Sequence, residues 1–377
     1  RINLTVQSGA LQITRLPEPV GVLEYATKYE IPMAINDGKE TIYTDKVLER
    51  LADGTADPYL YPDVNWMKEI LKKNTMQQQY NINNSGSSNI VNYFVSGSFL
   101  NQGAALKHQK EFNDNYGKRN GFDRYNFRSN IDIQASSRLK VQVDLATRTE
   151  KRTGPASSFN EVFDILRWIG SSSNPIKLPN GSLGYGSATT LPYWKNLYGL
   201  VTQSGYYENT TNATYGTISA IHELDFILPG LSMQGFFSFE NSGLSHTTRL
   251  QSFDSFHYQG LNVDGEPQYQ QYGIKSSLST GGYNTVNNKT YLDIRLLYQQ
   301  EWKDHKTTAQ LLGNRTLRTV NQELPYAYQG FSSRFSYGFK DRYFAEVNMS
   351  FNGSENFPKG NRYGFFPSGS LAWIASD

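Results

Sequence analysis

The sequence contains no cysteine. This absence excludes a disulfide framework, a thiolate metal site and a cysteine nucleophile. Basic and acidic residues nearly balance, with a net charge of +2 and a pI near 8.4, and lysines and arginines cluster no further than pairs such as Lys72-Lys73. The chain therefore lacks the basic patch expected of a nucleic-acid-binding protein, and we expect no nucleic-acid partner.

Long hydrophobic runs and catalytic motifs are also missing. No apolar run approaches the ~18 residues of a transmembrane helix, and the mean hydropathy is −0.57. The chain has no G-x-S-x-G elbow, P-loop or G-x-G-x-x-G motif, and its 5 histidines show no metal-ligand spacing. We therefore expect no enzymatic activity, catalytic residue, metal or cofactor. Paired carboxylates for glycoside hydrolysis are not excluded by spacing, but no pair stands out.

Tyrosine, phenylalanine and glycine are abundant, with 26, 21 and 32 residues. The clearest pattern is a strict two-residue alternation around the turn 136–138. Its apolar side comprises Tyr125, Phe127, Ile131, Ile133, Ala135, Leu139, Val141, Val143 and Leu145. Its polar side comprises Arg124, Asn126, Arg128, Asn130, Asp132, Gln134, Lys140, Gln142, Asp144 and Arg148. A three-residue loop pairs Ala135 with Leu139 and keeps both strands on one face, so we expect apolar residues near 147 to lie opposite Phe127.

Alternation that persists for ~10 residues exceeds the roughly 5–6 residues of an ordinary strand but matches a membrane-spanning β-strand. The pattern predicts roughly twelve strands, at 2–13, 76–85, 90–100, 122–135, 139–149, 213–228, 231–241, 289–302, 307–317, 330–339, 343–352 and 363–375. Short turns are predicted at 85–88, 136–138, 229–230, 303–306 and 340–342. The turn at Pro229-Gly230 would pair Leu228 with Leu231 and Phe226 with Met233.

Long connections alternate with these short turns. They are predicted at 14–75, 101–121, 150–212, 242–288 and 353–362, with a hairpin inside 242–288 and short helices within 19–31, 62–73 and 159–169. Sorting short turns to one end and long loops to the other is typical of outer-membrane β-barrels. We therefore expect an all-β fold, an antiparallel transmembrane β-barrel with short helices in long extracellular loops.

Several segments resemble one known family. Tyr337–Tyr343, Asn361–Ser368 and Trp373 resemble the barrel signature of the SusC/RagA family of TonB-linked outer-membrane transporters of Bacteroidetes. Further matches in family order are Asn92–Ser96, Leu100–Gly103, Arg124–Asn130 and Asp63–Trp66. Together they span nearly all of the chain.

The resemblance implies a barrel of about 22 strands, an N-terminal plug, a TonB-contacting segment and a SusD-like surface lipoprotein. The sequence begins in mid-strand, at Arg1, and stops after the strand 363–375. We therefore expect residues 1–377 to be one partial barrel domain that lacks the plug, the TonB box and the C-terminal strands. The implied partners are the lipoprotein, the TonB complex, outer-membrane lipid and an oligosaccharide or peptide substrate.

Two groups of residues are candidates for substrate contact. The polar lane could line the lumen of the barrel, and its candidates are Arg124, Asn126, Arg128, Asn130, Asp132, Lys140, Asp144 and Arg148. The alternative is a solvated wall whose mixed charges offset each other. The loop aromatics Trp168, Tyr193, Trp194, Tyr206 and Tyr207 could stack on a sugar ring or peptide side chain, or could pack the loop or meet a lid protein.

Two functions remain open. The first is TonB-dependent import of an oligosaccharide or peptide across the bacterial outer membrane. The second is a secreted β-sandwich that binds or hydrolyses glycans. A barrel exposes the stripe from Tyr125 to Leu145 to lipid, whereas a sandwich buries it against a second sheet. The position of this stripe therefore discriminates between them.

Overall fold

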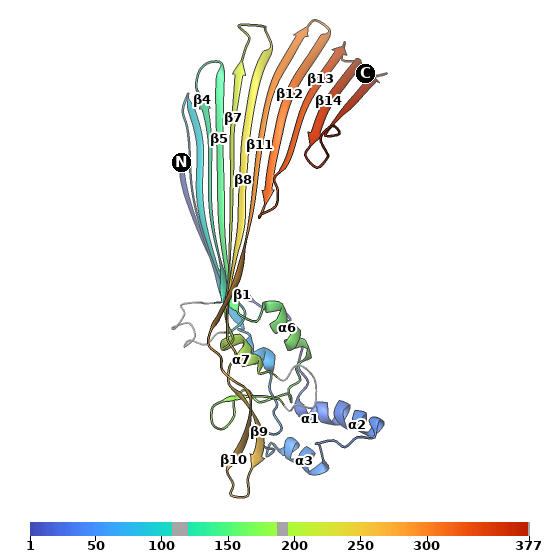
Figure 1. The fold of residues 1–377 in the computed structure, drawn as a ribbon. Coiled ribbons are helices and arrows are strands. Elements are labelled where there is room, and N and C mark those ends of the chain that lie inside the picture. Colours follow the sequence, from blue (N-terminus) through green and yellow to red (C-terminus); the bar gives the residue numbers. More distant parts are fainter. Residues whose placement is uncertain (108–119, 187–194, 376–377) are drawn as a thin grey trace.

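The computed structural model describes residues 1–107, 120–186 and 195–375, and most of them form one long antiparallel sheet (Figure 1). The sheet has 12 strands in the order β1-β2-β3-β4-β5-β7-β8-β11-β12-β13-β14-β15. Each strand thus lies beside the sheet strands that come directly before and after it in the chain. The strands are β1 (Ile2–Gln12), β2 (Asn74–Ser87), β3 (Val91–Gly103), β4 (Gly121–Gln134), β5 (Leu139–Pro155), β7 (Gly205–Glu223), β8 (Leu231–Leu250), β11 (Ser279–Trp302), β12 (His305–Val320), β13 (Tyr326–Phe339), β14 (Tyr343–Ser354) and β15 (Tyr363–Trp373). The predicted all-β fold and its strand count are confirmed.

The β4–β5 hairpin has the predicted register. Gln134 pairs with Lys140, and the Ala135 amide donates to the Leu139 carbonyl at 2.9 Å, so the turn leaves the apolar face continuous. Phe127 lies opposite Thr147 rather than an apolar residue. That detail of the prediction was wrong, because the apolar side of β5 ends at Leu145.

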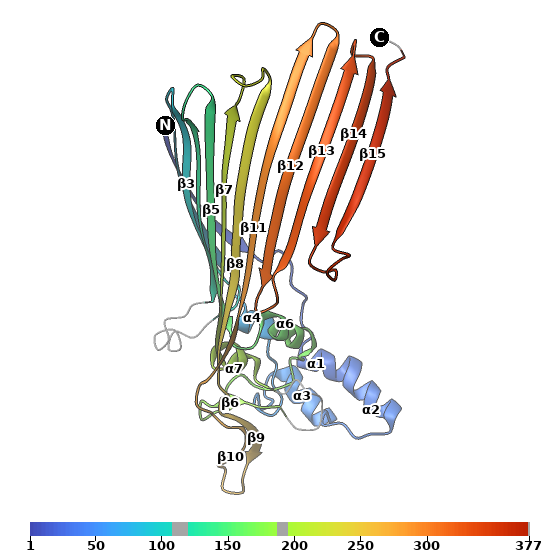
Figure 2. The same ribbon diagram turned by 45° about the horizontal axis from the view of Figure 1, so that its top comes forward.

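The apolar face of the sheet is exposed. Tyr125 and Phe127 are 50% and 40% exposed, and Ile294, Phe335 and Phe351 on later strands are 47% to 49% exposed. Among the described residues the only other sheet is a small three-stranded one in the loops, β10-β9-β6, and it does not cover this face (Figure 2). A sandwich would bury the stripe, so the arrangement is that of a barrel wall whose apolar side faces lipid.

Turns and loops are sorted as predicted. The short turns after β2, β4, β7, β11 and β13 lie at one end of the sheet, and the helices and long loops gather at the other (Figures 1 and 2). The connection 321–325 between β12 and β13 is only five residues long but lies at the loop end. We call the two ends the short-turn end and the loop end.

The turn between β7 and β8 differs from the prediction. His222 pairs with Met233 and Glu223 with Ser232, so β7 ends at Glu223 and the connection runs over 224–230. Within it the Leu228 amide donates to the Leu224 carbonyl at 3.1 Å, and the Gly230 amide donates to Asp225 Oδ1 at 2.8 Å. The Leu231 amide donates to the Leu228 carbonyl at 3.0 Å, so Pro229-Gly230 does form a tight turn. Proline cannot adopt the positive φ of the turns that match the twist of a two-residue hairpin, and the ladder therefore ends earlier, at Glu223.

Other boundaries shift by smaller amounts. The β2–β3 turn follows Ser87 rather than starting at Ser85, and the β11–β12 turn is the dipeptide Lys303-Asp304 rather than 303–306. The region 242–288 holds its predicted hairpin, β9 (Ser255–Leu261) with β10 (Pro267–Gly273), but β8 and β11 also extend into it. These extensions carry only scattered apolar residues, such as Leu244 and Val286, so no regular alternation marked them in the sequence.

The loops contain more helix than predicted. The segment 19–31 begins helix at Val22 as α1 (Val22–Tyr25), continues as the π-helix η1 (Ala26–Glu30) and runs on into α2 (Ile31–Asp37). The segments 62–73 and 159–169 contain α4 (Trp66–Ile70) and α6 (Phe159–Trp168). Unpredicted elements are α3 (Asp45–Asp53), α7 (Leu197–Thr202) and the short strand β6 (Leu183–Gly184). In the described part of the chain no helix is long and apolar enough to cross a membrane.

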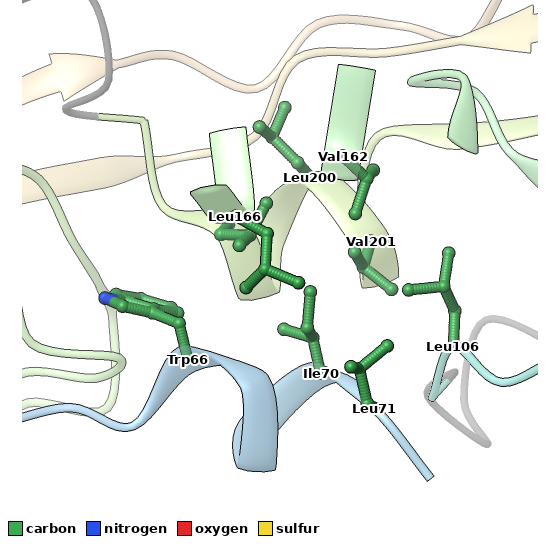
Figure 3. Close-up of a cluster of buried hydrophobic side chains, with 9 residues drawn as sticks. Trp66, Ile70, Leu71, Leu106, Val162, Leu166, Leu200 and Val201 are labelled. Atoms are coloured by element: carbon green, nitrogen blue, oxygen red, sulfur yellow. The ribbon is translucent and has the colours of Figure 1, made fainter. Parts of the chain in front are cut away.

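Three long loops pack together through one apolar cluster, which we call the loop core (Figure 3). Its buried members are Trp66, Ile70, Leu71, Leu106, Val162, Leu166, Leu197, Leu200 and Val201. They come from α4 and the residue after it, from α6 and α7, and from the segment after β3, so loops that are distant in the sequence form one structured unit at the loop end. A second cluster, Val22, Ala26 and Tyr43, joins α1 and η1 to the segment before α3.

Candidate functional site

All eight polar-lane candidates lie on one face of β4 and β5, opposite to the apolar stripe. The register pairs Asn126 with Arg148 and Asn130 with Asp144, and it places Arg124 across from Glu150. Because side chains alternate along a strand, the other members follow onto the same face. We call this surface the polar face.

In the short-turn half of the lane, polar side chains form hydrogen bonds with one another. Asn130 donates through Nδ2 to Asp144 Oδ1, and Gln142 donates through Nε2 to Asp144 Oδ2 at 2.8 Å. Asp132 lies in the next row, across from Gln142, and Lys140 lies across from Gln134 near the turn. This half is a mixed-charge wall held by side-chain hydrogen bonds.

The loop-end half of the lane is rich in arginine. Arg148 lies 3.6 Å from Glu150, and Asn126 donates to Ser98 Oγ at 2.9 Å. Arg124 Nε is buried and has no hydrogen-bond partner among the described residues. Cationic groups therefore outnumber carboxylates at this end of the lane.

The polar face continues across later strands with groups that the sequence did not single out. Asp293 on β11 is only 1% exposed and accepts from Arg295 Nε at 3.1 Å and from the Tyr291 hydroxyl at 3.0 Å. Phe236 lies opposite Asp293 on β8, and its ring meets the Tyr291 ring edge-on at 5.8 Å. The i and i+2 spacing of Tyr291, Asp293 and Arg295 was the available signal, because residues two apart share a face.

The aromatic candidates do not come together. Trp168 ends α6 and is 68% exposed, whereas Tyr207 is 9% exposed and its ring meets the Phe159 ring edge-on at 6.3 Å. Tyr206, half-buried, lies opposite Pro155. Tyr193 and Trp194 lie outside the described residues. Tyr207 therefore packs the loop end of the sheet, while Trp168 presents a free ring to solvent.

A different aromatic group forms where the loops meet the small sheet. The Tyr185 and Tyr272 rings stack at 4.8 Å, and His257 Nδ1 lies 3.2 Å from the Tyr185 carbonyl oxygen. Burial raises the pKa of the Tyr185 phenol, as does the neighbouring Tyr272. The two tyrosines also line a cavity of ≈ 450 Å³ together with Glu161 and Lys195. Sequence reasoning missed this group because its members come from two loops far apart in the chain.

A second cavity of ≈ 470 Å³ lies where the polar face meets the loops. Phe122 and Arg152 line it from the sheet, and Lys72 and Phe159 line it from the loops. Within the described ranges no group of three or more histidine, aspartate or glutamate side chains is placed to hold a metal ion. The arrangement offers polar and aromatic contact surface on a wall rather than a reactive constellation.

Two curated relatives cover most of the chain. It is 23% identical, over an alignment 392 residues long, to the TonB-dependent receptor P26 of Formosa agariphila, with 92% of this chain and 35% of that protein covered. It is 22% identical to the TonB-dependent receptor P3 of the same organism, with 82% of this chain and 31% of that protein covered. The chain thus spans about a third of the length of these relatives. No family model matches it.

Solved structures show the same fold. The RagAB peptide transporter superposes with a TM-score of 0.65 at 15% identity, covering 98% of this chain and 44% of that chain. The RagAB peptide importer in its open-open state gives a TM-score of 0.63 at 17% identity, with 98% and 43% covered. The resemblance to SusC/RagA-type TonB-dependent receptors, read from the sequence, is confirmed. So is the outer-membrane location that it implied.

Proposed function

We propose that the chain is part of the barrel of a TonB-dependent importer that carries a nutrient across the bacterial outer membrane. The observation that carries the proposal is the two-faced sheet, with exposed apolar side chains on one face and arginine, aspartate and amides on the other. Such a wall suits lipid outside and an aqueous passage inside. Its likeness to TonB-dependent receptors supports the same reading.

The twelve strands would be one part of a larger barrel. Among the described residues the sheet is open, with β1 and β15 each paired on one side only. Unpaired strand edges are not tolerated in the hydrocarbon of a bilayer. Residues 1–377 would therefore form a partial barrel domain that further strands close, with a plug and a TonB box in the same transporter.

The structured loops would receive the cargo. The loop core holds α4, α6 and α7 over the loop end of the sheet, so the helices there have a fixed position. A SusD-like lipoprotein is the proposed partner on this side, and it fits the likeness to RagAB, an importer of peptides by its name. Oligosaccharides and peptides are the proposed cargo classes, and transport rather than catalysis is the proposed activity.

Uptake by the native bacterium tests this function. A strain lacking the gene should lose uptake of one class of fluorescently labelled oligosaccharides or peptides. Collapsing the proton gradient in the parent strain should produce the same loss, because the TonB complex draws on that gradient. Unchanged uptake of every cargo, together with recovery of the protein from the soluble fraction, would favour the secreted glycan-binding alternative.

A further inference from the structure

We propose that the loop-end half of the polar face binds an anionic group on the cargo through Arg124 and Arg152. This inference rests on the proposed import function and narrows its cargo to molecules that carry a carboxylate or a sulfate ester. We call Arg124, Arg152 and Phe122 the anion subsite.

Charge is segregated along the lane. Arg124, Arg128, Arg148 and Arg152 all project from the polar face within one stretch of the β4–β5 hairpin, and Glu150 is the one carboxylate on that face among them. The flanking rows on β3 and β7 are neutral, with Ser96 and Ser98 on one side and Asn209 and Thr211 on the other. In this stretch four arginines face a single carboxylate, so the local charge is positive rather than balanced.

Neither subsite arginine forms an ion pair with a described residue. Glu150 is the cross-strand partner of Arg124, but its carboxylate lies 3.6 Å from Arg148 Nε and pairs with that side chain instead. Arg124 Nε is buried without a hydrogen-bond partner. Burying a guanidinium nitrogen unpaired is costly, so this side chain retains unused hydrogen-bonding capacity.

Phe122 holds one of the arginines in place. The Arg152 guanidinium carbon lies 5.5 Å from the centre of the Phe122 ring, and the two residues are cross-strand partners. A guanidinium stacked on an aromatic ring keeps its edge free for in-plane hydrogen bonds. Arg124 is the diagonal neighbour of Arg152, about 7–8 Å away in an antiparallel pair, so one anionic ligand can span both.

A cavity lies over the Phe122 and Arg152 end of this subsite, and Arg124 lies just outside its lining. It measures ≈ 470 Å³ and is lined by Phe122 and Arg152 together with Gln102, Thr75 and Lys72. No acidic side chain appears among its lining residues in the described part of the chain. The cavity is bounded by the sheet on one side and by the loops on the other, at the level where cargo would enter the passage.

The chemistry selects the ligand class. A guanidinium forms two parallel hydrogen bonds with a carboxylate or a sulfate, which a neutral hydroxyl cannot match. Uronic acids, sulfated sugars and acidic peptides share this group. The proposal therefore predicts a preference for charged cargo without choosing among these three sources.

Binding to the purified full-length protein in detergent tests the proposal. The probes are tetragalacturonate, a sulfated carrageenan tetrasaccharide and tetraglutamate, each compared with a neutral counterpart (galactotetraose, the desulfated tetrasaccharide and tetraglutamine). We expect at least one anionic probe to bind about tenfold or more tightly than its counterpart. We also expect its affinity to fall as salt is raised. The anionic probe that binds identifies the source.

Variants locate the binding. Arg124→Gln with Arg152→Gln should weaken the anionic probe about tenfold or more and leave neutral probes unchanged. The matched control is Arg138→Gln, because Arg138 also lies over a phenylalanine ring, Phe226 at 5.4 Å, but at the short-turn end. Heat-modifiable migration on gels verifies that each variant retains its folded barrel.

Three outcomes overturn the inference. Equal affinity for anionic and neutral probes would do so, as would equal losses in the subsite and control variants. Unchanged binding with lower thermal stability in the subsite double variant would mean that the arginines pair within the transporter, for example with its plug. The proposed import function fails separately. If a gene deletion leaves all uptake intact, the proposed import function is refuted but the anion-binding proposal is not. If the protein imports only a neutral cargo, the import function stands and the anion subsite is refuted.

Discussion

The sheet and the loop core use apolar side chains in opposite ways. In the loop core, Ile70 is 1% exposed and Val162 is fully buried. On the outer face of the sheet, Ile294 is 47% exposed and Leu311 is 46% exposed. The same residue types thus form a dry interior in one region and the exposed surface in the other.

The difference reflects the solvent that each region meets. The loop core is stabilised by removing apolar surface from water. The outer face of the sheet would meet lipid tails, which are as apolar as the side chains themselves, so its stability comes from ladder hydrogen bonds and from excluding charge. Matched substitutions in the two regions should therefore have unequal effects.

The largest expected effect is in the loop core. Ile70→Ala should destabilise the packed loops by about 2–5 kcal/mol, because it leaves a cavity among Leu166, Leu71 and their neighbours. Hydrogen exchange of the full-length protein in detergent should show faster exchange in α4, α6 and α7. The control is Ile294→Ala, the same change on the outer face, which should alter exchange little. Equal effects of the two changes would contradict the contrast between the regions.

A charge on the outer face should act next most strongly. Val141→Arg is expected to cost about 2–4 kcal/mol if Val141 lies near the middle of the bilayer. Urea unfolding of the full-length protein in lipid vesicles measures the cost. Gln142→Arg, one residue further on and on the polar face, should be tolerated. The facing assignment fails if both arginines are tolerated equally.

Substitution of Asn196 tests whether the loops are a folded unit. It is fully buried, donates through Nδ2 to the carbonyls of Ile176 at 2.8 Å and Gly184 at 3.0 Å, and accepts from the Gly199 amide at 3.0 Å as the N-cap of α7. Asn196→Ala should cost about 1–3 kcal/mol, because these backbone groups lose their partner. Limited proteolysis should then cut near 175–200, whereas Asn356→Ala in an exposed loop should not change the cleavage pattern.

The smallest expected effect lies in a short turn. Lys303 adopts a φ of 53°, in the left-handed region that favours glycine. Lys303→Gly should stabilise the β11–β12 turn by roughly 0.5–1 kcal/mol, because it relieves that strain. Urea unfolding in vesicles measures the change, with Asp304→Gly as the control that lacks a positive φ to relieve. A loss of stability at Lys303 would show that the turn gains nothing from glycine.

The alternation of side chains alone determined much of this protein. It specified the β4–β5 register, the two faces of the wall and the sorting of turns and loops. Successive side chains of a strand point to opposite faces, so every second residue matches the same surroundings. It also placed all eight polar-lane residues on one face. Alternation did not predict three kinds of element: the turn before Pro229, the extensions of β8 and β11, and the helices α3 and α7. In none of them do side chains alternate between a lipid-facing and a water-facing side.

Tertiary structure decided what the loops become and where charge is left unpaired. The loop core joins residues from Trp66 to Val201, and no local pattern records that α4 and α7 meet. Asp293 became buried through its neighbours on two strands, and Tyr207 was packed against Phe159 rather than left free. Arg124 and Arg152 were visible in the sequence as polar residues. Only the packing of strands and loops placed Arg152 in a cavity wall and left Glu150 paired with Arg148 rather than with Arg124, because the partners of distant residues are decided by the packed chain.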